Sequence, residues 1–200
     1  MRPITADELL RWLATLPPGE RDRAIEERLG IVADPRSEVP PGDDLIGYHP
    51  SGVESIVRAL AEVPVTERDV FVDLGAGLGK VVLLAALLTG AKARGVEIQP
   101  ALVAHAREAA AGLGLDVRFD VGDAREADLH DGTVFFLYLP FVGGALSAVL
   151  DRLREVAERR AIVVCALGVD LDRAHWLARR EVDEFWLAVY DSIVPGPLPG

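Results

Sequence analysis

Three glycines at alternate positions follow an aspartate in the stretch VFVDLGAGLGK, and together they form a pattern that could bind a ligand. Asp73 ends an apolar run, and Gly75, Gly77 and Gly79 come next, before a second apolar run. A glycine-rich turn between a strand and a helix lets a ligand approach the backbone closely, because no side chain stands in the way. Such turns hold phosphates, dinucleotides or adenosyl compounds.

The spacing of the glycines fits two of these three kinds of turn poorly. A phosphate loop has four residues between its glycines and a Ser or Thr after its Lys, whereas three residues separate Gly75 from Gly79 here and Val81 follows Lys80. A dinucleotide-binding turn needs a third glycine where this chain has Lys80, which would crowd the helix against the strand. Glu97 could still hold a ribose in that scheme. The spacing excludes a nucleotide triphosphatase and leaves an NAD(P)-dependent oxidoreductase as an alternative.

Acidic residues recur where three successive predicted strands end. They are Asp73 before the glycines, Glu97 in GVEI and Asp123 in GDA. The carboxyl ends of parallel strands meet at one edge of a sheet, and ligands of open α/β sheets bind along that edge. The three acids are therefore expected to line one ligand site.

Alternating strands and helices would bring these acids together. This alternation predicts a doubly wound, mostly parallel α/β sheet of seven strands with helices on both faces. The tail over 175–196 has β-rich character and no helix long enough for another crossover, so it predicts an antiparallel hairpin at the sheet edge. The predicted strands before it are 69–74, 93–98, 115–124, 133–141 and 161–168, and the helices between them are 80–90, 100–114 (closing near Gly112) and 143–160.

The N-terminal part is predicted to form a helical cap. We expect residues 1–66 to supply this cap and residues 67–200 the core, in one compact domain overall. Thr5 is the expected N-cap of a helical stripe over 4–29, which Pro17-Pro18-Gly19 interrupts.

A long irregular segment separates this stripe from a further predicted helix over 53–63. The segment, 31–52, is rich in Pro, Gly, Asp and Ser and includes Tyr48 and His49. Loops of that length inside a compact domain are usually functional or disordered. The sequence predicts either a lid over the site or a disordered linker.

Composition narrows the classes of partner. The net charge of −11 argues against a duplex nucleic acid, since phosphate neutralisation needs a basic face, and a cationic ligand suits the chain better. The single cysteine, Cys165, lies in an apolar run and predicts a buried, reduced thiol. The longest apolar run, VVLLAALL, is far shorter than the ~20 residues of a membrane span. These features predict a cytoplasmic protein with no membrane or metal partner, as a monomer or homodimer.

The three segments DLGAGLG, GVEI and GDA together resemble the S-adenosylmethionine (SAM) motifs of the class I methyltransferases. The predicted C-terminal hairpin also matches the antiparallel seventh strand of that family. The resemblance implies SAM as cofactor and S-adenosylhomocysteine as product. The cofactor-binding residues that it implies are Asp73, Gly75, Gly77, Gly79, Glu97, Asp123 and Ala124.

The three acids and the alanine among these residues each have an implied role in the family pattern. Asp73 contacts the amino-acid portion of SAM, and Glu97 accepts both ribose hydroxyls, a task that suits the two oxygens of a carboxylate. Asp123 accepts from the adenine amino group, with the backbone amide of Ala124 nearby.

The acceptor pocket is expected near the end of the fourth strand. Amino-methyltransferases often carry Asn or Asp there, followed by Pro-Pro and an aromatic residue, where this chain has YLPF. Tyr138, Phe141 and Tyr48 are the predicted catalytic and acceptor-pocket residues. Because methyl transfer is an in-line displacement at an activated sulfonium, such residues mostly align the acceptor.

A closer likeness is to the non-SET histone-lysine methyltransferases of the disruptor-of-telomeric-silencing family and their small bacterial relatives. VFVDLGAGLGKVVLLAA, the following GVEI and a preceding Y-x-P segment carry this likeness. The chain departs from that family in YLPF and in lacking basic segments for nucleosome docking, so a histone substrate is not expected. The sequence predicts a SAM-dependent methyltransferase acting on a small molecule or a protein side chain, lysine included. A non-catalytic SAM-binding or interaction domain is the alternative.

Overall fold

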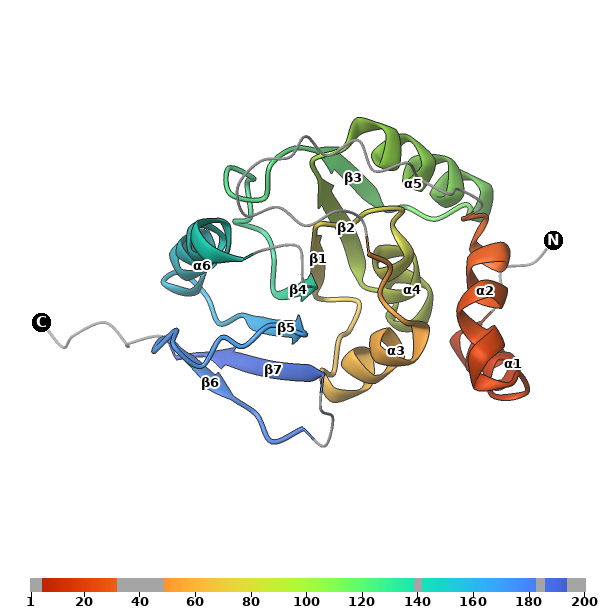
Figure 1. Ribbon diagram of the computed structural model, residues 1–200, viewed down its shortest axis with the longest axis horizontal. Coiled ribbons are helices and arrows are strands. Elements are labelled where there is room, and N and C mark those ends of the chain that lie inside the picture. Colours follow the sequence, from red (N-terminus) through yellow and green to blue (C-terminus); the bar gives the residue numbers. More distant parts are fainter. Residues whose placement is uncertain (1–4, 32–48, 139–141, 183–185, 194–200) are drawn as a thin grey trace, which may run out of the picture.

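The computed structural model describes residues 5–31, 49–138, 142–182 and 186–193, and its strands form one sheet (Figure 1). The seven strands lie in the order β3-β2-β1-β4-β5-β7-β6. They are β1 (Val70–Leu74), β2 (Lys92–Glu97), β3 (Arg118–Val121), β4 (Val134–Tyr138), β5 (Val163–Leu167), β6 (Leu177–Arg179) and β7 (Leu187–Ser192). The helices are α1 (Ala6–Ala14), α2 (Pro18–Leu29), α3 (Val53–Glu62), α4 (Lys80–Thr89), α5 (Pro100–Leu113) and α6 (Gly143–Ala157).

The strand pairing confirms the predicted fold class. β1 to β5 pair in parallel, whereas β7 pairs antiparallel with both β5 and β6. The strand order reverses between β1 and β4, and ligands of open α/β sheets bind at such a switch point. The predicted hairpin is present, and β7 is inserted between β5 and β6.

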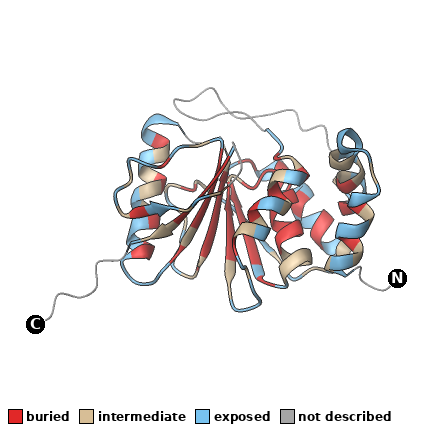
Figure 2. Ribbon diagram, turned by 90° about the horizontal axis from the view of Figure 1, so that it is seen from below, coloured by how far each residue is buried: buried red, intermediate tan, exposed pale blue. Residues whose placement is uncertain are grey.

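Two apolar layers cover the sheet because neighbouring residues of each strand point to opposite faces. Figure 2 shows the buried strands with helices on both sides of them. On β1, Phe71 faces the layer that α1 to α5 contribute to, and Val72 faces α6. Within the described residues, α6 is the one helix on that second face. Helices on both faces confirm the doubly wound architecture.

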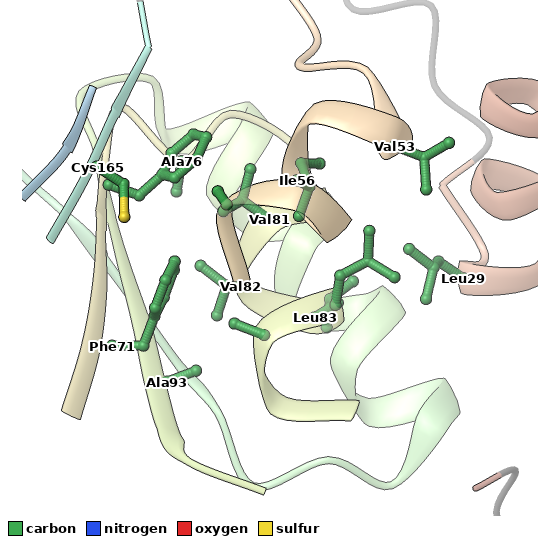
Figure 3. Packing of buried hydrophobic residues seen from close by; sticks show 14 of the residues in the cluster. Leu29, Val53, Ile56, Phe71, Ala76, Val81, Val82, Leu83, Ala93 and Cys165 are labelled. Carbon is green, nitrogen blue, oxygen red and sulfur yellow. The ribbon is translucent and has the colours of Figure 1, made fainter. Parts of the chain in front are cut away.

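Helix α4 lies at the centre of the first layer and is buried from Lys80 to Ala85. In Figure 3, Val82 lies toward Phe71 of the sheet and Leu83 toward Leu29 of α2. This position explains why the helix is apolar nearly all round rather than on one stripe. It also fixes the glycine turn, because α4 begins directly after that turn.

The N-terminal helices join the same apolar layer. Thr5 caps α1 as predicted: its hydroxyl accepts from the Glu8 amide, and the Glu8 carboxylate accepts from the Thr5 amide. Pro18 opens α2, at a position where its missing N–H costs nothing. The buried side chains of these helices, Leu9, Leu13, Ile25 and Leu29, belong to the cluster that contains Phe71.

Two further expectations meet the structure in different ways. Helix α5 ends at Leu113, near Gly112 as predicted, and Gly114 caps it with a φ of 66°. Leu113 and Leu115, on either side of this cap, pack against the core. Most of the expected lid, including Tyr48, lies outside the described residues.

No helix in the part of the chain that the structure describes is long and apolar enough to cross a bilayer.

Cys165 is buried in β5, as the sequence predicts. Burial raises the pKa of its thiol to about 12. A thiolate is therefore scarce at neutral pH, which argues against a nucleophilic role.

Candidate functional site

The glycine turn lies at the carboxyl edge of the sheet and is tied to the end of β2. Gly75, Gly77 and Gly79 have φ angles of 87°, 53° and 82°, a region that side chains with a Cβ rarely adopt. The amides of Gly75 and Ala76 both donate to the Val96 carbonyl, at 2.9 and 3.0 Å. The turn is thus held in place without a ligand, so its geometry is preorganised.

Gly79 also has a packing role that the sequence did not reveal. A Cβ at this position would lie 2.6 Å from a ring atom of Phe119 and 3.0 Å from the Ala106 Cβ. The absence of a side chain at Gly79 therefore lets the turn approach β3 and α5 closely. Access for a cofactor is a separate reason for glycine, and it applies to all three glycines of the turn.

Glu97 ends β2 beneath this turn and is 7% exposed. Its carboxylate accepts from the Gly77 amide at 3.0 Å and from the Gln99 amide at 2.9 Å. A carboxylate has about four lone-pair sites, so two remain for hydroxyl donors. The arrangement fits a ribose diol.

Asp73 lies near the end of β1, the strand that pairs with β2, and it is 3% exposed. Burial raises the pKa of its carboxyl to about 8, and the negative charge of Glu97 contributes to the same rise. A cation brought to this position would favour the ionised form. The ammonium group in the amino-acid portion of SAM is such a cation.

Asp123 follows β3 and forms an ion pair that the sequence did not predict. Arg125 Nε donates to both of its carboxylate oxygens, each at 2.9 Å, and the Arg125 amide donates to Oδ1. The hydrogen bonds from Arg125 lower the pKa of Asp123, which is therefore ionised at neutral pH. An adenine amino group would have to share these oxygens with the guanidinium. Ala124 beside it is buried.

The predicted acceptor residues are described only in part. Tyr138 is the last residue of β4, is half-buried and packs against the first apolar layer. Its backbone lies next to the end of β5, at the same sheet edge as the acids. Phe141 and Tyr48 lie outside the described residues.

Two residues near the site have features that sequence reasoning missed. Ile98 follows Glu97 and is 41% exposed, an apolar surface at the edge where an adenosine would lie. Lys80 follows the turn and is buried, with its ammonium paired to Asp22 and Glu26 of α2. An apolar residue directly after a strand-end acid is a signal that could have found Ile98. The partners of Lys80 lie more than fifty positions away in the chain, and spacing gives no signal for them.

Comparisons with known proteins agree with this geometry. The family model of a methyltransferase domain matches residues 71–159. An RNA methyltransferase from Salinibacter ruber, solved in complex with S-adenosyl-L-homocysteine, is 30% identical with a TM-score of 0.59, and the alignment covers 76% of this chain and 97% of that one. No curated protein matches the sequence significantly.

Two further structures share the fold at lower identity. The putative methyltransferase yhhF from Escherichia coli is 23% identical with a TM-score of 0.55, over 71% of this chain and 84% of that one. The precorrin-6y C5,15-methyltransferase from Geobacter metallireducens is 18% identical with a TM-score of 0.53, over 79% and 95% of the two chains. The sheet order, the preorganised glycine turn, the buried strand-end acids and the Salinibacter relative lead to one conclusion: the chain belongs to the class I SAM-dependent methyltransferases.

Proposed function

We propose that the chain transfers the methyl group of SAM to the side-chain amine of lysine in an acceptor protein. The observation that carries this proposal is the net charge of −11, because an acidic surface attracts cationic partners and repels polyanions. The resemblance of VFVDLGAGLGK and GVEI to the non-SET lysine methyltransferases supports it.

The proposed cofactor site uses the residues at the carboxyl edge. Asp73 would pair with the ammonium group of SAM and Glu97 with its ribose hydroxyls. Asp123 and the Ala124 amide would contact the adenine, with Ile98 against the ring. The supporting observations are the burial of the first two acids, the left-handed glycine turn and the exposed position of Ile98.

The chemistry needs little from the protein beyond alignment and exclusion of water. The neutral lysine amine attacks the methyl carbon, the carbon–sulfur bond breaks, and its electron pair stays on sulfur. The methylated ammonium then loses a proton to solvent. Tyr138, at the end of β4, is proposed to orient the amine through its hydroxyl.

Replacing Glu97 with Ala should remove most of the SAM affinity. The change removes two charge-assisted hydrogen bonds to the ribose and the anchor of the Gly77 amide, so we expect the Kd to rise about a hundredfold or more. Titration calorimetry with S-adenosylhomocysteine measures the change. Asp116→Asn, an exposed acid before the start of β3, is the matched control and should bind as the wild type does. Wild-type affinity in Glu97→Ala would contradict the site.

The acceptor class is tested with tritiated methyl-SAM. The purified enzyme is incubated separately with pentalysine, with a pentaglutamate control and with total RNA. We expect label in pentalysine that is resistant to base hydrolysis, as an N-methyl bond is. RNA is the second candidate acceptor, because the Salinibacter relative is an RNA methyltransferase. Labelled RNA with unlabelled pentalysine would replace the lysine proposal.

A further inference from the structure

Exposed apolar side chains gather at the carboxyl edge of the sheet. Among the described residues, the large exposed ones are Leu10, Ile98, Val121, Val142, Trp186 and Ile193. Three of these six lie where strands end or begin at this edge, and a fourth precedes a helix that follows β4: Ile98 after β2, Val121 at the end of β3, Trp186 before β7, and Val142 before α6. Single exposed apolar residues need no explanation, but their concentration at a ligand-binding edge does.

The four residues divide into two groups on either side of the switch point between β1 and β4. Ile98 and Val121 flank the end of Glu97's strand, on the side proposed for the nucleoside. Trp186 and Val142 lie on the other side, toward β5 and the chain that follows β4. The second group lies away from the nucleoside side, toward the part of the edge where the acceptor is expected.

Register places Trp186 beside the end of β5, which in turn lies beside the end of β4 with Tyr138. Tyr138 pairs with Leu167 of β5, and Leu167 pairs with Leu187, the first residue of β7. Because β7 runs antiparallel, Trp186 precedes it at the same edge where β4 and β5 end. The Gly168 amide donates to the Trp186 carbonyl at 2.7 Å, which holds the tryptophan backbone at this position.

Trp186 differs from the other two tryptophans in its exposure. Its side chain is 68% exposed, the highest value among the large apolar residues that the structure describes. Trp12 is half-buried beneath the guanidinium of Arg28, at 4.8 Å, and Trp176 packs against the second apolar layer. Trp186 thus offers an aromatic face at the edge where the acceptor is expected.

A hollow of about 270 Å³ beside Trp186 is lined by two charged residues, one acid and one base. Asp170 is the acid, and its Oδ1 accepts from the Asp172 amide at 2.8 Å. Arg179 also lines the hollow, but its guanidinium is paired with the Asp172 carboxylate at 3.3 Å. An aromatic face with a carboxylate beside it attracts an organic cation through cation–π and Coulomb interactions.

We propose that Trp186 is an acceptor-binding residue, which holds against its ring the alkyl-ammonium chain of a lysine next to the methylated one, with Asp170 as counter-charge. The inference rests on the proposed function and names the residues that select its substrate. Trp186 would act on acceptor affinity and leave SAM affinity unchanged, because the nucleoside side of the edge does not include it.

The test compares steady-state methylation of pentalysine by four variants. Trp186→Ala should lower kcat/KM for pentalysine about tenfold through KM, with the KM for SAM unchanged. Trp186→Phe keeps an aromatic face and should recover most of the activity. Asp170→Asn keeps the acceptor for the Asp172 amide, removes the charge and should raise the KM for pentalysine. Ile193→Ala is the control, an exposed apolar residue after the other end of β7.

The outcomes separate this inference from the proposed function. If the wild type methylates pentalysine and Trp186→Ala does so equally well, the role of Trp186 is overturned and the proposed function stands. If the wild type labels RNA but not pentalysine, the proposed function fails, and the lysine contact fails with it. A thermal melt of each variant, expected to match the wild type, shows that a change in KM is not a loss of folding.

Discussion

Replacing Asp73 with Asn is expected to abolish SAM binding and, at alkaline pH, to stabilise the cofactor-free protein. The two effects have one cause, the burial of this carboxyl at the end of β1. Burial favours the neutral form, and Asn resembles that form closely in size and shape. SAM binding needs the charged form, which Asn cannot supply. The variant therefore exchanges function for stability, as residues of binding sites often do.

The free energy of unfolding should depend on pH because the pKa of Asp73 is raised to about 8 in the folded state. Its unfolded value is about 3.9. Below about pH 4 both states are protonated and the full stability is present. As the pH rises toward 8, the unfolded state loses this proton and the folded state keeps it, so the free energy of unfolding falls. Four pH units at about 1.4 kcal/mol each give a loss on the order of 5 kcal/mol, which Asn avoids.

Urea unfolding at pH 4.5 and pH 8.5 measures this effect. We expect Asp73→Asn to unfold near the wild-type midpoint at pH 4.5 and at a clearly higher urea concentration at pH 8.5, with equal m-values. Asp191→Asn is the matched control with the opposite sign, because hydrogen bonds from Arg180 lower the pKa of Asp191. Its ionised form stabilises the fold above about pH 4, so that variant should be less stable than the wild type at pH 8.5. A lower midpoint for Asp73→Asn at pH 8.5 would refute the argument.

The strand-end acids could be predicted from the sequence because each one interrupts or follows an apolar run. A strand buried on both faces reads as a continuous apolar segment, and an acid at its end is therefore conspicuous. Asp73 and Glu97 are placed at the predicted edge for this reason. The antiparallel β7 could be predicted because no helix-length segment remains between the last runs of the tail.

Other features depend on how the chain turns and packs, which the spacing of residue types does not encode. Asp123 pairs with Arg125, two positions away, only because the chain turns directly after β3. The need for glycine at Gly79 comes from Phe119, forty positions along the chain. The alternating pattern of the tail predicts a strand, but it does not predict which face of that strand is covered. The exposure of Trp186 therefore depends on how the hairpin packs.

Lys80 is the clearest of these cases. In a dinucleotide-binding turn, a side chain at this position would crowd the helix against the strand, which is why the sequence disfavours such a site. The structure instead carries the side chain to α2, where Nζ lies 2.7 Å from Glu26 Oε1 and 3.0 Å from Asp22 Oδ1. Asp22 Oδ1 also accepts from the Val53 amide at 2.8 Å, at the start of α3, which has no side-chain cap of its own. Through these bonds the residue that follows the glycine turn holds two N-terminal helices beside it.

Loss of the Lys80 cation should lower the stability of the fold much less than loss of its two anionic partners. The Lys80 side chain is 5% exposed, whereas Asp22 and Glu26 are 50% and 30% exposed. Lys80→Met leaves two acids that water can reach and keeps the apolar stem in place, so we expect a cost of about 1–2 kcal/mol or less. The double variant Asp22→Asn/Glu26→Gln leaves a buried ammonium without a counter-charge, and should cost about 3–5 kcal/mol.

Urea unfolding of three variants tests this asymmetry. The triple variant, which combines Lys80→Met with both amide substitutions, removes the unpaired cation and should recover the stability of Lys80→Met. The coupling energy from this cycle isolates the ion pairs from the packing of the stem. If Lys80→Met costs as much as the amide pair, or the triple variant recovers nothing, the burial of the charge does not decide the stability of this contact. Recovery in the triple variant would show that the turn and the N-terminal helices are coupled through one buried cation.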